Sequence, residues 1–312
     1  MKKILITGAF GQIGSELKDY LRSIYGVSQV ISSNYEMMVD NGPFELIDVT
    51  NYHQIEAAVI KHQVDTIIHL AALLSAVGEE TPTLAWKINM DGLFNVLEVA
   101  RKYKCQVFHP SSIGAFGPST TKNNVPQVTI QRPTTIYGVS KVSGELLCDY
   151  YVKRFNVDVR GVRFPGLISY QMLPGGGTTD YAVDIFYEAL KHQSYTCYLS
   201  EDTQLDMMYM PDALKAIVDL MEAPFDKLHH HNAYNVSAMS ITPKELAQAI
   251  QEILPDFTIR YDIDPVRQSI ADSWPNSIDS SDAKKDWNFE PHYDLQAMTK
   301  DMLEKLRKKG IQ

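Results

Sequence analysis

Apolar and polar positions follow two different periods along the first half of the chain. Short runs rich in Val, Ile and Leu alternate with longer stretches whose apolar residues recur at helical spacing. The short runs predict strands and the longer stretches predict helices, with strands over residues 3–7, 29–32, 66–70, 106–109 and 157–164 and helices over residues 12–25, 52–62, 81–102 and 137–154. Strands separated by helices of this length indicate βαβ units with right-handed crossovers. The pattern therefore predicts an α/β fold built on a doubly wound parallel sheet.

The regularity weakens after about residue 165. Further helices are predicted near residues 180–192, 211–221, 242–253 and 295–308. Residues 262–286 are rich in Asp, Ser and Pro, so we expect a loop there. We expect residues 1–165 to form the doubly wound domain. Residues 166–312 should form a smaller mixed α/β region, with some return of the chain to the first domain.

Composition narrows the class of protein. The chain has 312 residues, of which 45% are hydrophobic and 21% charged, as in ordinary globular proteins. Its formal net charge of −9, from 29 basic and 38 acidic residues, is opposite in sign to that of a typical nucleic-acid binder. No apolar run is long enough for a membrane span, and the first residues lack the apolar region of a signal peptide. We therefore expect a cytoplasmic protein with no nucleic-acid or membrane partner.

The cysteines and histidines favour neither disulfides nor a metal site. Cys105, Cys148 and Cys197 are odd in number and widely spaced, without a Cys-x-x-Cys pair. His229, His230 and His231 are adjacent, so they cannot all face one metal, and no acidic or cysteine partner stands at ligand spacing. We expect free cysteines, a surface loop at the histidines and no metal.

Three glycines stand between the first predicted strand and the first predicted helix, as Gly8-Ala9-Phe10-Gly11-Gln12-Ile13-Gly14. Gly8 would permit a tight turn, Gly11 would leave room for a pyrophosphate, and Gly14 would let the helix pack close to the strand. The N-terminus of the following helix would present free N–H groups and partial positive charge to phosphates. This context predicts a dinucleotide site of the Rossmann type.

A candidate catalytic group follows later in the chain. Tyr137 and Lys141 form Tyr-x-x-x-Lys at the start of a predicted helix, so one helical turn brings them to the same face. A phenol is a poor base at neutral pH, but an ammonium group beside it favours the phenolate. Ser112 follows a predicted strand and has a hydroxyl that could hold a substrate oxygen. The set predicts proton abstraction from an alcohol while a hydride leaves its carbon.

The Gly-x-x-Gly-x-x-Gly spacing together with Ser112, Tyr137 and Lys141 resembles the extended branch of the short-chain dehydrogenase/reductases, the NAD-dependent epimerase/dehydratase family. Asn34 stands where that family usually has an acidic residue for the adenosine ribose. Residues 28–40 contain no Arg or Lys for a 2′-phosphate, which favours NAD over NADP. The resemblance implies that the cofactor contacts are Gly8, Gly11, Gln12, Ile13, Gly14, Asn34, Asp48, Val49, Leu70, Ala71, Ala72, Asn89, Tyr137, Lys141 and Leu167. For Asn89, a backbone hydrogen bond within a helix is the alternative role.

Further stretches resemble the short-chain type of L-threonine 3-dehydrogenases nearly end to end. The most specific are PGGGTTDYAVD at residues 174–184 and ADSWP at residues 271–275. The resemblance implies oxidation of the L-threonine β-hydroxyl to 2-amino-3-oxobutanoate, with NAD as cofactor and no metal. It implies that the substrate contacts are Ser75, Ser112, Tyr137, Thr178, Thr179, Asp180 and Trp274. Thr179 or Asp180 could instead cap a helix, and Trp274 could have only a packing role.

The resemblance also implies a homodimer that forms through the helices at residues 81–102 and 137–154. We further expect Gly175, Gly176 and Gly177 to give a mobile backbone that closes over a small ligand.

Two other functions remain open from the sequence. A nucleotide-sugar epimerase or dehydratase shares the fold and the catalytic tyrosine, but it would need cations for a diphosphate, and no arginine stands between Gly166 and Arg260. A non-catalytic NAD-sensing protein would often lose the Tyr137–Lys141 pair, which this chain retains.

Overall fold

The computed structural model describes residues 1–172 and 177–311, apart from the side chain of Ala76. Six parallel strands form the main sheet, in the order β3-β2-β1-β4-β5-β7. Their bounds are Phe44–Leu46, Val30–Asn34, Ile4–Thr7, Thr66–His69, Gln106–Phe108 and Val159–Arg160. The strand order runs outward in both directions from the neighbours β1 and β4. Such a switch point leaves a crevice at the carboxyl ends of the strands, where ligands bind in open α/β sheets.

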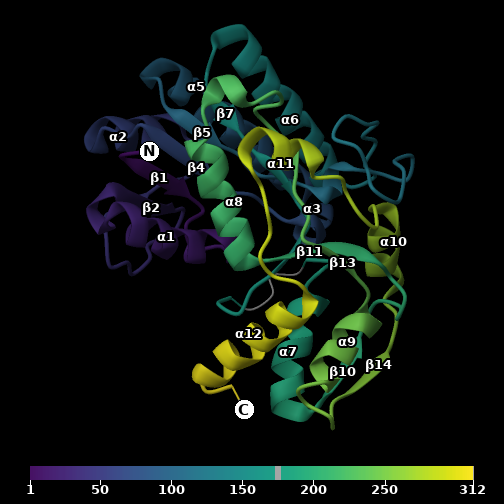
Figure 1. Ribbon diagram of the computed structural model, residues 1–312. Coiled ribbons are helices and arrows are strands. Elements are labelled where there is room, and N and C mark those ends of the chain that lie inside the picture. Colours follow the sequence, from purple (N-terminus) through teal and green to yellow (C-terminus); the bar gives the residue numbers. More distant parts are fainter. Residues whose placement is uncertain (173–176, 312) are drawn as a thin grey trace.

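Helices cover both faces of this sheet, as the doubly wound prediction requires (Figure 1). Strand β1 shows why: Ile4 and Ile6 pack into one core, whereas Leu5 packs into another. The first core receives α1 (Gln12–Tyr25), α8 (Met210–Glu222) and α11 (Ser281–Trp287), and the second receives α2 (Tyr52–His62), α5 (Gly92–Tyr103) and α6 (Ile136–Phe155). Two helices from the second half of the chain therefore complete one face of the sheet.

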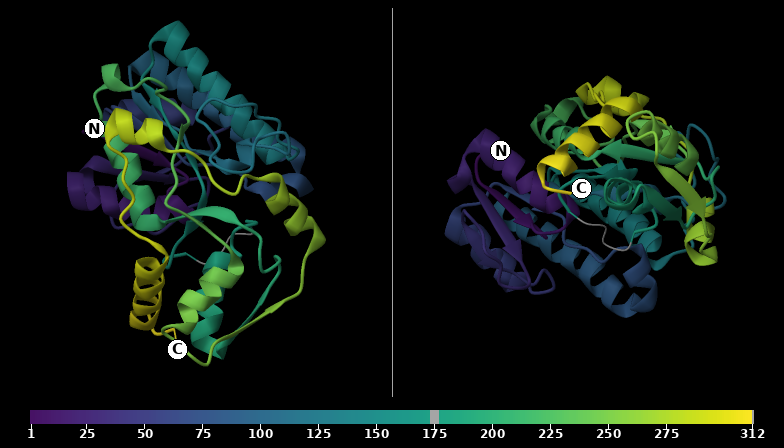
Figure 2. Two further views of the ribbon diagram at one scale, coloured as in Figure 1. Left: turned by 45° about the vertical axis from the view of Figure 1, so that its right-hand side comes forward. Right: turned by 90° about the horizontal axis from the view of Figure 1, so that it is seen from below.

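A second region lies below the main sheet in the view of Figure 1, and both views of Figure 2 keep it apart from β1 and β2. Its core is formed by α7 (Tyr181–His192), α9 (Pro243–Gln251) and α12 (Leu295–Lys308). Two small sheets belong to it. They are β13-β11-β9 (Met239–Ile241, Leu205–Tyr209, Gly166–Ile168) and β10-β14 (Ser194–Cys197, Thr258–Tyr261). The boundary at residue 165 stays a prediction.

Two sequence-based expectations about secondary structure were wrong. The strand expected over 157–164 is two strands that are separated at Gly161, where a Cβ would lie 2.2 Å from the His109 carbonyl oxygen, so only glycine fits there. After this break, β8 (Val162–Phe164) joins a separate small sheet with β6 (Ser111–Ser112) and β12 (Tyr234–Asn235). The loop expected over 262–286 contains α10 (Pro265–Ser273) and α11. Asp264 caps α10 by accepting hydrogen bonds from the Val266 and Arg267 amides.

The helix expected over 81–102 begins as α4 (Pro82–Trp86) and continues as α5, with a π-helical segment, Lys87–Asp91, between them. Such segments are often found at functional sites, because they change the direction of a side chain inside a helix. Asn89 lies in this segment, and its side chain does not bond within its own helix. Its amide accepts a hydrogen bond from the Leu73 N–H at 2.8 Å and donates one to the Leu73 carbonyl at 3.1 Å.

A buried ion pair ties α6 to the small sheet. Arg163 on β8 donates from Nε and Nη2 to the two carboxylate oxygens of Glu145, at 2.9 and 2.8 Å. The Ser111 hydroxyl also donates to Glu145, and Arg163 Nη1 donates to Asn235 on β12 at 3.0 Å. Both charged side chains are more than nine-tenths buried. The pair therefore fixes α6 against β6, β8 and β12 in a region where water cannot replace either partner.

We expect Arg163→Met to lower the free energy of unfolding by about 3–5 kcal/mol, because it leaves the Glu145 carboxylate buried without its partner. Denaturant unfolding followed by circular dichroism measures this change. Arg154→Met removes an exposed arginine from α6 and serves as control, with an expected loss below about 1 kcal/mol. Equal losses in the two variants would contradict a special role for the buried pair.

Candidate active site

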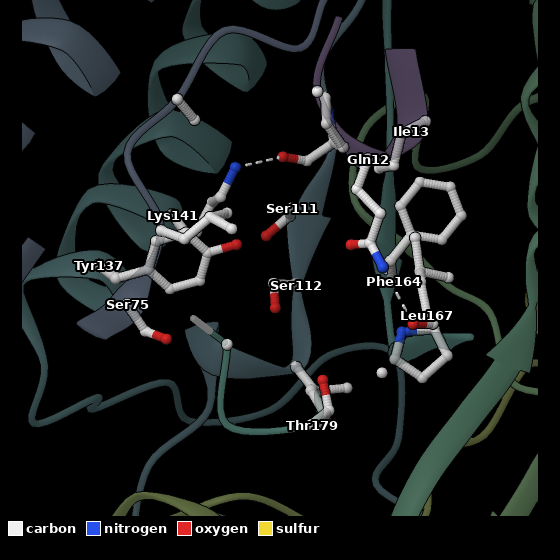
Figure 3. A pocket seen from close by; sticks show the side chains of 18 of the residues that line it. Gln12, Ile13, Ser75, Ser111, Ser112, Tyr137, Lys141, Phe164, Leu167 and Thr179 are labelled. Atoms are coloured by element: carbon white, nitrogen blue, oxygen red, sulfur yellow. Dashed lines mark hydrogen bonds between the residues drawn. The ribbon is translucent and has the colours of Figure 1, made fainter. Parts of the chain in front are cut away.

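One pocket lies at the carboxyl ends of β1, β4 and β5, at the switch point of the sheet (Figure 3). It is lined from both halves of the chain. Sixteen of the residues named from the sequence line it, and these are Gly8, Gly11, Gln12, Ile13, Gly14, Leu70, Ala72, Ser75, Ser112, Tyr137, Lys141, Leu167, Thr178, Thr179, Asp180 and Trp274. The pocket therefore brings the expected catalytic residues, the glycine loop and all the expected substrate contacts around one space.

Five residues expected to contact the cofactor do not line the pocket: Asn34, Asp48, Val49, Ala71 and Asn89. Asn34 ends β2, and its amide donates to the Glu36 carbonyl at 3.4 Å. Asp48 accepts hydrogen bonds from the amide and hydroxyl of Thr50. Val49 is buried in the core beside α5. Their roles toward a cofactor stay predictions.

The glycine loop has the shape that a pyrophosphate site needs. Gly8 has φ +68°, and a Cβ there would lie 2.7 Å from the Ala71 nitrogen. A Cβ on Gly14 would lie 2.8 Å from Ala9 Cα, so this glycine is required by packing of α1 on the loop. A Cβ on Gly11 would meet only the Gly8 oxygen, at an ordinary 3.5 Å, and would project beside the pocket. No side chain caps α1 at Gly11, so the helix N-terminus can bind an anionic group. These residues fit a dinucleotide.

Local structure brings Tyr137 and Lys141 together. The Thr135 side chain caps α6 by accepting a hydrogen bond from the Gly138 amide at 3.1 Å, which places Tyr137 in the first turn. Lys141 lies one turn later, and its Nζ is 5.4 Å from the centroid of the Tyr137 ring. The same Nζ donates to the Pro110 carbonyl at 2.8 Å. The phenol and the ammonium group therefore face the same pocket, as Figure 3 shows.

Ser112 ends β6, and its Oγ accepts a hydrogen bond from the Gly114 amide at 3.1 Å. The Tyr137 ring packs against Gly114, where a Cβ would lie 3.1 Å from Tyr137 Cε1. The serine hydroxyl and the phenol are thus close together, and the hydrogen bond between them acts to lower the pKa of Tyr137. Two hydroxyl groups on one side of a pocket can hold the oxygen of an alcohol between them.

Burial controls the charge of both groups. Burial raises the pKa of Tyr137, and the Ser112 hydroxyl opposes this shift. Burial also lowers the pKa of Lys141 to about 8, and the negative charge of Glu145 opposes that shift. Lys141 is therefore mainly protonated at neutral pH, whereas Tyr137 keeps its proton in the protein alone.

Asn89 does not line the pocket, but its hydrogen bonds help to fix the segments that carry Tyr137 and Ser75. Besides holding both polar groups of the Leu73 backbone, its amide donates to the Ser140 hydroxyl at 3.2 Å. Ser140 in turn donates to the Tyr137 carbonyl at 2.7 Å. The chain beside Ser75 is thereby tied to the first turn of α6.

Three of the expected substrate contacts, Thr178, Thr179 and Asp180, follow one another in the chain and line the pocket together. Thr178 is buried, and Thr179 and Asp180 follow it immediately before α7. The Asp180 carboxylate accepts a hydrogen bond from the Gly177 amide at 2.6 Å and does not cap α7 with its side chain. Of the expected closing glycines, Gly175 and Gly176 lie outside the described residues.

Seven residues line the pocket without having been expected from the sequence: Leu74, Pro110, Ser111, Ile113, Phe164, Pro165 and Gly166. Most are neighbours of expected residues, so proximity in the chain was the available signal. Ser111 is different, because its link to Glu145 and Arg163 joins residues far apart in sequence, which no local pattern reveals.

The histidine cluster has acidic partners that the sequence did not indicate. His229 Nδ1 lies 2.7 Å from Asp286, and His230 Nε2 lies 2.9 Å from Asp282, because α11 packs beside this loop. Within the described part of the chain, no group of three or more His, Cys, Asp or Glu residues could hold a metal ion. The three cysteines are free and buried. No described helix has both the length and the apolar character to span a bilayer.

Comparison with known proteins gives consistent matches over the whole chain. The model of the NAD-dependent epimerase/dehydratase family matches residues 4–237. An uncharacterized epimerase/dehydratase of Staphylococcus saprophyticus is 57% identical, over 99% of this chain and 98% of its own length.

Solved structures are equally similar. L-threonine dehydrogenase from Clostridium difficile is 62% identical with a TM-score of 0.99, covering 100% of this chain and 99% of its own. L-threonine dehydrogenase from Phytophthora infestans is 50% identical with a TM-score of 0.97, covering 99% and 100%. A monomeric L-threonine 3-dehydrogenase from a metagenome is 44% identical with a TM-score of 0.95, covering 98% and 99%.

Two glycine substitutions should separate packing from ligand binding. Gly11→Ala should change the free energy of unfolding by about 1 kcal/mol or less, because its Cβ makes only an ordinary contact, yet it should weaken NADH binding at least several-fold. Gly14→Ala should destabilise the fold by about 1–3 kcal/mol, because its Cβ meets backbone that cannot give way. Thermal unfolding and NADH titration by fluorescence measure the two effects. Unchanged NADH affinity in Gly11→Ala would contradict the placement of a dinucleotide at this loop.

Proposed function

Because the chain belongs to the NAD-dependent epimerase/dehydratase family, we propose that it oxidises L-threonine at the β-hydroxyl, with NAD+ as acceptor. The observation that carries this proposal is the full-length match at 62% identity to a solved L-threonine dehydrogenase. The pocket adds to it, since Ser112, Tyr137 and Lys141 meet there with the glycine loop.

The chemistry follows from the groups that face the pocket. Ser112 and Tyr137 hold the threonine hydroxyl. Tyr137, once ionised, takes the hydroxyl proton while the carbon–oxygen bond becomes a carbonyl. When bound, NAD+ supplies the acceptor for the hydride that leaves the same carbon. Lys141 contributes positive charge that favours the phenolate over the phenol.

The cofactor contacts we propose are those of the glycine loop, together with Leu70, Ala72, Leu167 and Lys141 from the pocket wall. The free N-terminus of α1 and the open side of Gly11 support a pyrophosphate there. NAD is favoured over NADP because no Arg or Lys occurs in residues 28–40 to pair with a 2′-phosphate.

For the amino acid, we propose contacts from Ser75, Thr178, Thr179 and Asp180, which offer donors and acceptors to a zwitterion. Trp274 lines the same space and would cover the ligand. A nucleotide-sugar epimerase is the second candidate. The stretch between Gly166 and Arg260 gives it no arginine for a diphosphate, so the observations favour the smaller substrate.

Formation of NADH from NAD+ with L-threonine, compared with UDP-glucose, tests the function directly. We expect net NADH formation that requires threonine. Conversion of the sugar nucleotide without net NADH formation would favour the epimerase instead. Binding of NADH with no turnover of either compound would indicate a non-catalytic NAD-binding protein.

Tyr137→Phe removes the proton acceptor and retains the ring that packs on Gly114. We expect kcat to fall by roughly 10²–10⁴, the usual contribution of general acid–base catalysis, with NADH affinity little changed. Ser112→Ala should lower kcat less, because it removes a hydrogen bond but no proton acceptor. Steady-state kinetics at several pH values measure both. Near-normal turnover in Tyr137→Phe would show that another group is the base.

We also propose a homodimer through α4, α5 and α6. Phe94, Leu146 and Tyr150 are 49%, 66% and 52% exposed, and the rings of Phe94 and Tyr150 both contact Tyr151. They form one exposed apolar stripe across α5 and α6, a feature typical of interfaces. One similar enzyme is monomeric, so the shared fold does not by itself determine the oligomeric state. The residues exposed on the surface determine it.

Leu146→Asp should convert the dimer to a monomer, because it places a charge in the middle of this apolar stripe. Sedimentation at micromolar concentration measures the assembly. Val39→Asp changes an equally apolar residue that is 98% exposed in the loop after β2, and it should leave the dimer intact. A wild-type protein that sediments only as a monomer would contradict the proposal.

A further inference from the structure

A short segment after β9, residues 169–171, is held from three directions by residues that do not line the pocket. We call the contacts that hold this segment the β9 clamp. The Ser169 hydroxyl donates to the Glu16 carboxylate on α1. The Tyr187 hydroxyl on α7 donates to the Tyr170 carbonyl at 3.1 Å. Lys309, at the end of α12, completes the set.

Lys309 makes three of the contacts. Its Nζ donates to the Tyr170 carbonyl at 3.1 Å, to the Gln171 carbonyl at 3.3 Å and to Gln171 Oε1 at 2.8 Å. An ammonium group that binds two successive carbonyls fixes the direction of that backbone. The last turn of the chain therefore holds a segment more than a hundred residues earlier.

Glu16 connects the same segment to the cofactor side. It lies one turn after Gln12 on α1, the helix whose N-terminus faces the pocket. Gln12 Nε2 donates to the Leu167 carbonyl at 3.4 Å, and Glu16 accepts from Ser169, so two successive turns of α1 hold two alternate residues of the same strand end. A shift of this strand relative to α1 would break both contacts.

The position of β9 in turn affects the substrate wall. A Cβ on Gly166 would lie 2.9 Å from Thr179 Cγ2, so Thr179 packs directly on the strand. Tyr187, which holds Tyr170, lies on α7, and this helix begins immediately after Asp180. The described residues thus connect the clamp to Thr179 by two routes.

We propose that Glu16 and Lys309 are positioning residues for the amino-acid substrate: by fixing residues 169–171 they hold Thr179 at the distance from the glycine loop that threonine binding requires. This inference rests on the proposed threonine oxidation. Neither side chain lines the pocket, so both act through β9 and not on the ligand.

The environment of Glu16 supplies an independent readout. Burial raises the pKa of Glu16 to about 7, while Ser169 and the charge of Lys309 oppose the shift. Tyr187 and Tyr209 also interact with Glu16, and both are uncharged at neutral pH because burial raises their pKa values. The carboxyl therefore changes its ionisation near neutral pH, protonated on the acid side and ionised on the alkaline side.

Lys309→Met tests the clamp with little risk to folding, because Lys309 is exposed. We expect the KM for threonine to rise roughly two- to ten-fold, the range for loss of one or two hydrogen bonds, with kcat and NADH affinity close to wild type. Lys308→Met is the matched control: it removes the exposed neighbouring charge and leaves the Lys309 contacts in place. The proposal would be overturned if the two variants had equal KM values for threonine. It would also be overturned if Lys309→Met weakened NADH binding as much as it raised the KM for threonine.

Glu16→Gln adds the pH test. Glutamine resembles the protonated carboxyl, so the KM of this variant should agree with wild type in acid solution and differ from it in alkaline solution. Parallel pH profiles across the range would assign Glu16 a structural role only.

Amide hydrogen exchange of residues 177–190 gives a readout that does not need activity. Exchange should be faster in Lys309→Met than in Lys308→Met if the clamp holds this wall in place. A wild type that makes no NADH from threonine would contradict the proposed function alone. Equal exchange in the two variants would contradict the clamp, whatever the substrate.

Discussion

The buried pair of Glu145 and Arg163 is the constraint on which the geometry of the pocket depends. Glu145 lies one turn after Lys141 on α6, and Arg163 lies on a strand of the small sheet that carries Ser112. A carboxylate that receives two guanidinium bonds has little freedom to rotate or translate. The helix with the phenol and the strand with the serine are therefore held at one relative position.

This arrangement explains why the six-stranded sheet alone does not make the site. The sheet supplies the ends of β1, β4 and β5, and with them the glycine loop and the segment before Ser112. The break at Gly161 then diverts the chain from β7 into β8, where Arg163 can reach α6. Continuing the chain through β9 brings Leu167 to Gln12 and Gly166 to Thr179. After Gly161, β8 and β9 thus each contribute residues to the lining of the pocket.

Local patterns in the sequence predicted most elements in the first half of the fold and several of the groups that line the pocket. Gly8, Gly14, Tyr137 and Lys141 could be identified because short spacing alone decides whether a turn closes or two side chains share a helical face. The division of β7 from β8 could not be foreseen, since it coincides with a close approach of Gly161 to the His109 carbonyl, which only the folded chain shows.

The long-range contacts that stabilise the site could not be predicted from the sequence either. Asn89 binds the Leu73 backbone, and Ser111 reaches Glu145, across many residues of chain. Helices α10 and α11 were missed for a different reason. Their composition is typical of loops, although Asp264 before Pro265 is a recognisable helix start.

The electrostatics of the pocket bear on how Tyr137, the proposed base, would become ionised. In the protein alone burial raises the pKa of Tyr137, and the Lys141 ammonium is bonded to the Pro110 carbonyl and lies 5.4 Å from the phenol ring centroid. Lys141 by itself therefore does not outweigh burial. A second positive charge close to the phenol would favour the phenolate, and an oxidised nicotinamide ring carries one. If NAD is the cofactor, its oxidised ring would supply such a charge and its reduced ring would not, so Tyr137 would retain its proton beside the reduced form. Burial of Tyr137 therefore makes ionisation of the phenol depend on a nearby positive charge, which we propose an oxidised cofactor would supply.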